Sequence, residues 1–283
     1  MKTRVITGII MVIAMVAVLI LSTTLVFPIT LAVLSVIAMK EVFSVHSLSK
    51  NAYLTVPCYV AAAAMPPIAY FVRVIKGAPE SEFIMILAAT VVLLMMYVLG
   101  VSVFAKGKIA YSTFASAFVM VTYILVSFSA ICVLRFIVDD VIGLFCLGLV
   151  IIGAWVSDVF AYFTGVLFGK HKLIPEVSPK KTIEGSVGAI VFTTVATVLL
   201  GILATAFTGV KSNILVLALS GPVLSVAGQI GDLFASIVKR EHGVKDYGDI
   251  LPGHGGIMDR FDSILATSVV TLVITLLFAP FSW

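Results

Sequence analysis

The run EFIMILAATVVLLMMYVLGVSVF, Glu82–Phe104, decides the fold class of this chain. It carries no charge after its first residue, and as a helix it is long enough to cross a bilayer, which takes roughly 20 apolar residues. The whole chain shares this character, since 61% of its 283 residues are hydrophobic and only 11% are charged. Soluble domains carry about 25% charged residues. The sequence therefore predicts an integral membrane protein.

Outward from this run, the chain divides into nine predicted spans, or eight if Pro28 does not separate the first two. They cover about 5–25, 27–46, 53–75, 82–104, 111–135, 141–168, 185–208, 212–239 and 260–281. The first run follows Lys2 and Arg4, as in a signal peptide, but it is close to spanning length and lacks an obvious cleavage site. We interpret it as an uncleaved helix. The expected fold is an all-α, polytopic membrane bundle of about nine transmembrane helices.

The basic residues predict the orientation of the bundle. With nine spans, all Lys and Arg residues except Arg73, Lys76, Arg135 and Lys211 lie on the side of the N-terminus, Lys106 and Lys108 among them. Cytoplasmic loops are enriched in Lys and Arg, so the N-terminus is predicted to be cytoplasmic. This distribution also explains the net charge of +4, and no nucleic-acid partner is expected.

The two halves of the chain are expected to differ in role. Residues 1–140 form spans for packing and dimer contacts, where only Lys40 and Glu41 are unusual. These two are expected to snorkel or to pair locally, with a functional role as the alternative. Residues 141–283 form a catalytic region with cytoplasmic loops at 169–184 and 240–259. The three cysteines Cys58, Cys132 and Cys146 fall inside spans without the spacing of a disulfide or zinc site.

An acid lies inside the eighth span, in GQIGDLFASIVKR, Gly228–Arg240. A charge at membrane depth costs about 2.5–3.5 kcal/mol on insertion scales unless it has a partner. Asp232, Ser236 and Lys239 follow at i, i+4 and i+7, so they share one helix face. This face is either a structural Asp–Lys pair or a polar strip leading to a site.

The segment KDYGDILPGHGGIMDRFD, Lys245–Asp262, is rich in charge and glycine. Gly255 and Gly256 would let backbone N–H groups approach anionic oxygen, with His254 at the tip of the turn. Asp259 and Asp262 open the last helix, where the helix dipole alone favours acids. If Asp232 and Asp259 faced each other they would repel without a cation. Mg²⁺, which binds carboxylates together with substrate phosphates, would resolve this.

The other loop, GKHKLIPEVSPKKTIEG, Gly169–Gly185, presents Lys180 and Lys181 after a Ser-Pro turn. Such a cationic pair attracts phosphate groups, although positive-inside topology alone also accounts for it. Upstream, Asp158 is a third acid within a span. It is expected either to line the site or to pair with a basic residue there.

The stretch SIVKREHGVKDYGDILPGHGGIMDRFDS, Ser236–Ser263, resembles the signature of the phosphatidate cytidylyltransferases, or CDP-diacylglycerol synthases. The likeness lies in S-x-x-K-R, K-D, L-P-G-H-G-G and D-R-x-D, with no departure at the charged positions. The segments SDVFAYFTGVLFGKHKL, Ser157–Leu173, and SPKKTIEG, Ser178–Gly185, also resemble that family. Together these motifs span residues 157–263, whereas the N-terminal half resembles the family only in length and hydropathy.

The resemblance implies an Mg²⁺-dependent nucleotidyltransferase that makes CDP-diacylglycerol and pyrophosphate from CTP and phosphatidate in phospholipid biosynthesis. It implies a helical homodimer with a cytoplasm-facing pocket, and the short termini suggest a bacterial inner membrane. Asp232 and Asp259 match the family's metal-binding pair, which a potassium ion can accompany. The expected catalytic residues are Asp232, Asp259, Lys239, Arg240 and His254. The expected substrate-binding residues are Ser178, Lys180, Lys181, Thr182, Asp158, Ser236, Lys245, Asp246, Gly255, Gly256, Arg260 and Asp262.

Two other functions stay open. A CTP-dependent lipid kinase would also use CTP but would transfer its γ-phosphate to a lipid. An ion-coupled transporter would spread its acids through the bundle and have two related halves. In this sequence the acids cluster at the cytoplasmic ends of the spans and the halves are unlike.

Overall fold

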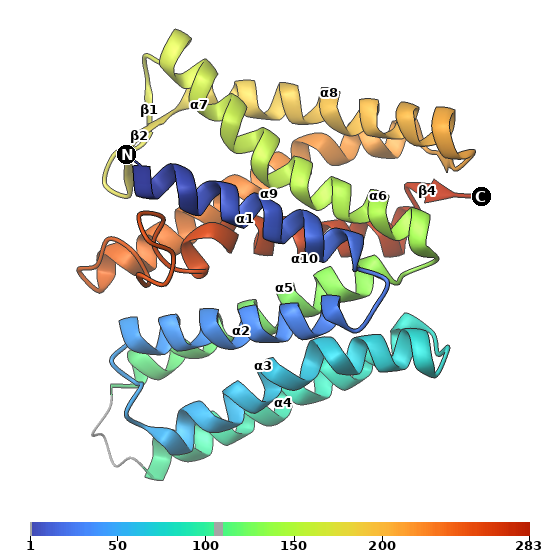
Figure 1. Ribbon diagram of the computed structural model, residues 1–283. Coiled ribbons are helices and arrows are strands. Elements are labelled where there is room, and N and C mark those ends of the chain that lie inside the picture. The colour runs from blue at the N-terminus through green and yellow to red at the C-terminus, as the bar shows by residue number, and fades with distance from the viewer. Residues whose placement is uncertain (1, 105–109) are drawn as a thin grey trace. The chain divides into compact units, whose positions relative to one another are not determined.

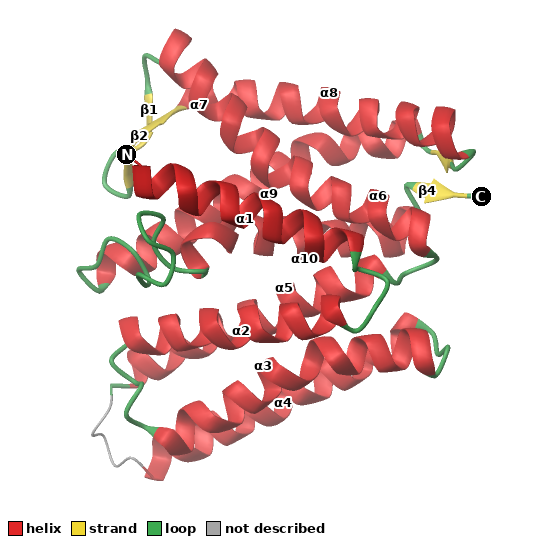
Figure 2. Ribbon diagram, in the orientation of Figure 1, coloured by secondary structure: helices red, strands yellow, loops and turns green. Residues whose placement is uncertain are grey.

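A computed structural model describes residues 2–104 and 110–283, so Lys106 and Lys108 lie outside the described residues. Helices dominate these residues, which confirms the predicted all-α class (Figures 1 and 2). The helices are α1 (Lys2–Ile20), α2 (Val26–Val45), α3 (Ala52–Tyr70), α4 (Glu80–Phe104), α5 (Tyr111–Arg135), α6 (Asp140–Ile151), α7 (Ser157–Phe168), α8 (Ile183–Thr208), α9 (Ile214–Glu241) and α10 (Met258–Phe278), with π-turns η1 (Phe71–Ile75) and η2 (Ile152–Val156).

Within the described residues, eight helical segments are long and apolar enough to cross a membrane, and the apolar part of α1, Ile6–Ile20, is shorter. The first two predicted spans are separate, as expected. The break falls at Leu21–Leu25, ahead of Pro28. Pro28 itself lies in the first turn of α2, where the missing N–H of proline costs no helical hydrogen bond. The chain therefore has the predicted succession of apolar helices.

The chain divides into two compact units. The first comprises Met1–Phe136 and Val244–Arg260, and the second comprises Ile137–Gly243 and Phe261–Trp283. In the first unit, α2 packs against α3 and α5, and α4 packs against α3 and α5. Buried polar side chains link these helices: His46 Nε2 lies 2.9 Å from Ser116 Oγ, and Arg135 Nε donates to Ser22 Oγ at 2.8 Å.

In the second unit, α8 packs against α7 and α9 at glycine positions. A Cβ at Gly185 would lie 2.6 Å from the carbonyl oxygen of Ala161, and one at Gly188 would lie 2.3 Å from Thr164 Oγ1. Glycine thus permits the close approach of α7 and α8. Between α6 and α7, the π-turn η2 brings Gly153 against α9, where a Cβ at Gly228 would be 2.8 Å from the Gly153 carbonyl oxygen.

Side chains cap several helices of the second unit. Asp139 accepts from Val141 N and Ile142 N at the start of α6. Asn213 caps α9 through Val216 N. Two small antiparallel sheets, which the sequence did not predict, join β1 (Lys172–Ile174) to β2 (Ser178–Thr182), and β3 (Lys211–Ser212) to β4 (Phe281–Ser282).

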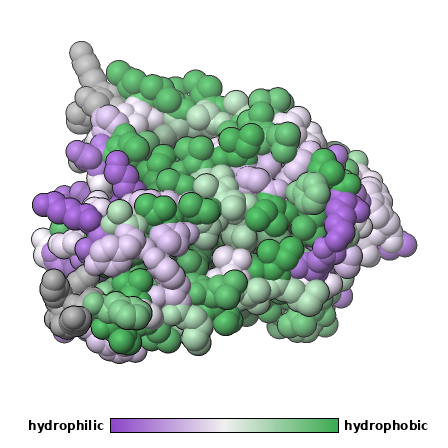
Figure 3. All heavy atoms as spheres, turned by 90° about the horizontal axis from the view of Figure 1, so that it is seen from below, coloured by the Kyte–Doolittle hydropathy of each residue, from purple (hydrophilic) through white to green (hydrophobic). Residues whose placement is uncertain are grey.

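Apolar side chains cover most of the face drawn in Figure 3, and hydrophilic ones gather toward its left and right margins. Large apolar residues such as Leu93, Val103 and Phe207 are mostly exposed. A surface of this kind is stable in hydrocarbon and would aggregate in water. It agrees with the membrane assignment made from composition.

Candidate functional site

Asp232, in α9, forms an ion pair with a lysine from the β1–β2 hairpin. Lys181 Nζ lies 2.6 Å from Asp232 Oδ2, with the two side chains 22% and 29% exposed. Ser236 Oγ approaches the other carboxylate oxygen at 3.4 Å, as the predicted shared helix face requires. A carboxylate at membrane depth is thus compensated by a cation, as the cost of burying a lone charge demands. The lysine paired with Asp232 is therefore Lys181 of the hairpin, whereas the helical spacing had indicated Lys239.

Further charged groups of the second unit surround this pair. The buried carboxyl of Asp262, in α10, interacts electrostatically with those of Asp232 and Asp158 and with the Lys239 ammonium group. Lys239 is also buried, 9% exposed, whereas Asp158 and Arg240 are exposed. Residues predicted separately from three spans are therefore brought into one electrostatic neighbourhood. Carboxylates gathered in this way favour a cation nearby.

The β1–β2 hairpin presents the predicted phosphate-binding residues. Lys180 is exposed and Ser178 is partly buried. Thr182 is buried, and its hydroxyl accepts from Gly185 N at 3.1 Å, which caps α8. His171 Nδ1, at the other end of the hairpin, lies 2.7 Å from Glu184 Oε1. Both contacts join the hairpin to the start of α8 and so fix the strand that carries Lys181.

Asp259, in the first unit, is held by the loop that precedes α10. Its Oδ2 accepts from Tyr247 N at 2.7 Å and from Gly256 N at 2.9 Å, and the residue is 8% exposed. Two backbone donors fix the orientation of this carboxylate. A carboxylate fixed in this way, before any ligand arrives, is suited to bind a cation.

The rest of this loop is exposed or tightly turned. Gly255 has a positive φ of 85°, a conformation that favours glycine, and its carbonyl accepts from Leu251 N at 3.0 Å. His254 is partly buried next to α1, where a Cβ at Gly8 would lie 3.9 Å from its ring. Lys245, Asp246 and Arg260 are exposed. These three charged side chains are thus accessible to a ligand from solvent.

Glu41 lies next to this loop, and its hydrogen-bond partners differ from what the sequence indicated. Its carboxylate accepts from Ile257 N at 2.9 Å and from Met258 N at 2.8 Å, far away in the sequence. The expectation of snorkelling or local pairing is therefore wrong for Glu41, which is 7% exposed. The available signal was an acid inside an apolar span, which marks an unknown partner without naming it.

The donor chemistry fits a hard divalent cation. Within residues 2–104 and 110–283, no three His, Cys, Asp or Glu side chains lie close enough to form a complete protein-built metal site. Mg²⁺ does not need one, because it commonly uses one or two carboxylates together with water and substrate phosphates. The orientated carboxylate of Asp259 and the half-buried carboxylate of Asp232 are ligands of that type.

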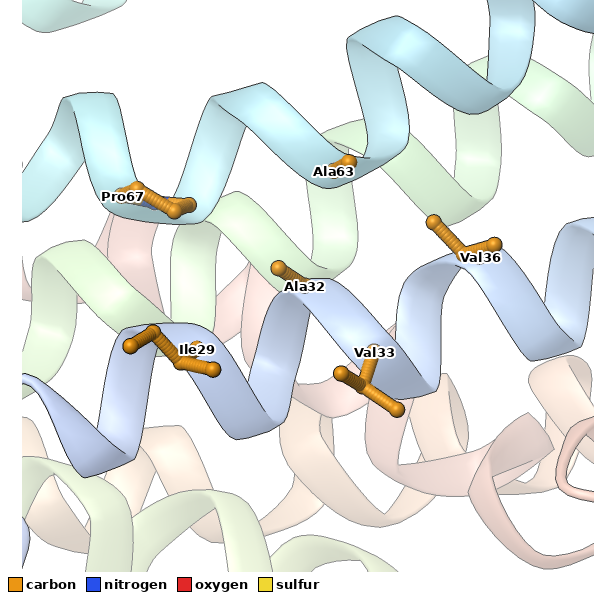
Figure 4. Close-up of a pocket in the computed structure, with 6 residues that line it drawn as sticks. All are labelled: Ile29, Ala32, Val33, Val36, Ala63 and Pro67. Atoms are coloured by element: carbon orange, nitrogen blue, oxygen red, sulfur yellow. The ribbon is translucent and has the colours of Figure 1, made fainter.

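An apolar hollow of about 320 Å³ lies between α2 and α3 (Figure 4). It is lined by Ile29, Ala32, Val33, Val36, Ala63 and Pro67. Since none of these side chains is polar, the hollow is not suited to hold a phosphate or a nucleotide. The polar groups described above are the better candidates for chemistry.

Comparison with known proteins bears on the class of this chain. The model of the cytidylyltransferase family matches residues 2–278. The chain belongs to this family. The match reaches beyond the motifs of residues 157–263 and includes the N-terminal half, so the cytidylyltransferase family accounts for both compact units.

Several bacterial relatives resemble the chain along nearly its whole length. Proteins named phosphatidate cytidylyltransferase from Staphylococcus epidermidis and Staphylococcus haemolyticus are 33% and 32% identical, over 94% of this chain and 95% of theirs. A protein of that name from Staphylococcus aureus is 31% identical over the same shares. This member of the cytidylyltransferase family is therefore similar to these relatives over almost their whole length.

Proposed function

We propose that this protein transfers the cytidylyl group of CTP to phosphatidate, giving CDP-diacylglycerol and pyrophosphate in phospholipid biosynthesis. The similarity to enzymes named phosphatidate cytidylyltransferase over 94% of the chain carries this proposal. The apolar helices support it, because a lipid substrate would reach the enzyme from the bilayer. We also propose a bacterial inner membrane, a cytoplasmic site and a homodimer, on the basis of the sequence.

In the proposed reaction, a phosphate oxygen of phosphatidate attacks the α-phosphorus of CTP. A new P–O bond forms, the bond between the α-phosphorus and the α–β bridging oxygen breaks, and pyrophosphate leaves with its electron pair. The nucleophile is already an anion, so no covalent enzyme intermediate is needed. The task of the protein is to bring two polyanions together, which requires positive charge at fixed positions.

Basic residues of the second unit supply part of this charge. Lys180 and Lys181 in β2, with Lys239 and Arg240 at the end of α9, would hold the triphosphate and the departing pyrophosphate. Lys181 is already fixed on Asp232. Asp232 and Asp259 would hold Mg²⁺, which supplies positive charge to the phosphoryl oxygens, and K⁺ is a candidate second ion.

Labelled substrate tests this function directly. Purified protein is incubated with CTP labelled at the α-phosphorus, phosphatidate and Mg²⁺, and the lipid is extracted. The expected result is label in CDP-diacylglycerol with an equal amount of pyrophosphate. A lipid kinase would release CDP, and the label would stay in the aqueous phase. With diacylglycerol in place of phosphatidate, no cytidylyl group should be transferred to lipid. A transporter would yield no labelled lipid and no pyrophosphate, which would overturn the proposal.

A further inference from the structure

The carboxylate of Glu41, from α2, closes the N-terminus of α10. Ile257 N donates to Oε1 at 2.9 Å and Met258 N donates to Oε2 at 2.8 Å. The first N–H groups of a helix have no acceptor within the helix, and the positive end of the helix dipole attracts an anion. Glu41 therefore satisfies two buried donors and places its charge where the helix favours it.

The loop before α10 is shaped around this carboxylate. A Cβ at Gly256 would lie 2.5 Å from both Glu41 oxygens, and one at Gly248 would lie 2.7 Å from Oε1. Contacts below 3.0 Å are not tolerated without movement. Glycine at these two positions lets the main chain pass close to Glu41. For Gly256, this steric reason adds to the one expected from the sequence, which was close approach of the main chain to the anionic substrate.

Three consecutive N–H groups connect Glu41 to Asp259. Gly256 N donates to Asp259 Oδ2, and the next two donors, Ile257 N and Met258 N, both go to Glu41. The peptide groups that orient Asp259 thus adjoin those that Glu41 holds. Loss of the Glu41 bonds would leave Ile257 N and Met258 N buried without acceptors, and the loop would turn them toward new partners.

We infer that Glu41 is a positioning residue, which fixes the loop at residues 244–258 so that Asp259 presents its carboxylate in one orientation. The catalytic part of this inference rests on the proposed function. The structural part does not, because the hydrogen bonds of Glu41 involve only groups of this chain. Through Glu41, the N-terminal half would thereby contribute to the reaction.

The first test compares Glu41→Gln with Lys40→Gln. Gln keeps the size of Glu, but its amide has only one oxygen acceptor. Its NH₂ group would therefore face one of the two main-chain N–H donors. Hydrogen exchange of peptides covering 244–260 is measured without metal or substrate. We expect exchange about tenfold faster in E41Q, as for loss of a hydrogen bond to a charged group. In K40Q, whose side chain is exposed, exchange should match the wild type. Unchanged exchange in E41Q would overturn the inference.

A second measurement separates positioning from a loss of folded protein. The Mg²⁺ concentration for half-maximal activity should rise about tenfold in E41Q. His46→Ala serves as the control, because it removes a buried contact to Ser116 near the end of the same helix. That variant should lower only the maximal rate, through the fraction of folded enzyme. An equal Mg²⁺ requirement in E41Q and wild type would contradict a positioning role.

A double-mutant cycle tests the same contact from the loop, and its Gly248→Ala arm keeps Glu41 intact should E41Q fold poorly. Gly248→Ala places a methyl group against Glu41 and should speed exchange at 255–259. In Glu41→Ala the space is open, so the added G248A change should have little effect. Equal effects of G248A in both backgrounds would refute the contact. If the wild type is inactive but hydrogen exchange changes as expected, the proposed function is refuted. The structural part of the inference, that Glu41 fixes the loop at residues 244–258, would still hold.

Discussion

Lys181 Nζ contacts Asp232 Oδ2 at 2.6 Å, and this ion pair joins the strand β2 to the helix α9. The pair is half-buried, so solvent screens it only in part. Each partner compensates the charge of the other at a depth where a lone charge would be costly. The lysine proposed to bind triphosphate is thus held against the acid proposed to bind metal.

Replacement of Lys181 by Gln should lower kcat/KM for CTP by about tenfold, because Asp232 loses its counter-charge and the triphosphate loses a cation. Lys181→Arg should restore part of the loss, since it keeps the charge. Steady-state rates at varied CTP measure both effects. The exposed Lys180, changed to Gln, should cost less. Wild-type kcat/KM in K181Q would argue against this role.

Replacement of Asp232 or Asp259 by Asn should reduce kcat by about a hundredfold or more, because each change removes a proposed metal ligand worth several kcal/mol. Ser236→Ala, which removes only a 3.4 Å contact to Asp232, should have a small effect. Initial rates of CDP-diacylglycerol formation by monodisperse protein provide the measurement. Folded D232N and D259N proteins that work at the wild-type rate would refute the metal proposal.

Removal of divalent cations should abolish activity, and Mg²⁺ alone should restore it, because two polyanions must otherwise approach each other unscreened. The measurement is the rate after treatment with EDTA and titration with Mg²⁺. Exchange of KCl for NaCl at constant ionic strength then tests the second ion. Full activity in EDTA would rule out the metal-dependent reaction, and equal rates in both salts would rule out K⁺.

Gly185→Ala should destabilise the second unit by about 1–3 kcal/mol, as expected when a methyl group is forced into a packed contact. Its Cβ would lie 2.6 Å from the main-chain oxygen of Ala161, which cannot rotate away. Gly100→Ala is the matched control, since nothing lies within 4 Å of its Cβ position. Unfolding in detergent compares the two variants. Equal stability of both variants would contradict close packing of α7 and α8 at Gly185.

The predicted orientation can be tested by labelling introduced cysteines from either side of the membrane. All three native cysteines are buried, so they should react slowly. Glu176→Cys, in the hairpin turn, should react with an impermeant maleimide only after the membrane is opened. Ser282→Cys, near the C-terminus, should react in intact cells. The reverse pattern would place the N-terminus outside.

The sequence sufficed for the spans and for contacts along one helix. Composition and length alone indicate the helices, because hydrocarbon leaves the backbone few other structures. The shared face of Asp232 and Ser236 follows from helical spacing, and the structure confirms it. Both results depend only on residues close together in the chain.

Contacts between distant segments were beyond sequence reasoning. Lys181 was expected to bind phosphate, and nothing in its loop indicated Asp232 as its partner. Glu41 was recognised as unusual, but its partners are main-chain N–H groups 216 and 217 residues away, which carry no side-chain signal. The two small sheets were missed because strands of two to five residues have no clear periodicity. The orientation of the bundle and the residues that bind substrate or metal stay predictions.

The π-turn at Ile152–Val156 is the place where this span can change in length without losing its contacts. Each residue removed from a regular α-helix rotates the remainder of that helix by about 100°. A π-turn closes i→i+5 hydrogen bonds and therefore holds one residue more than an α-turn. Deletion of one residue here would leave an α-turn, so α7 would keep its face and Gly165 would still meet the start of α8. Variation among related chains should therefore tolerate a single-residue gap at this place and spare such gaps within the regular part of α7.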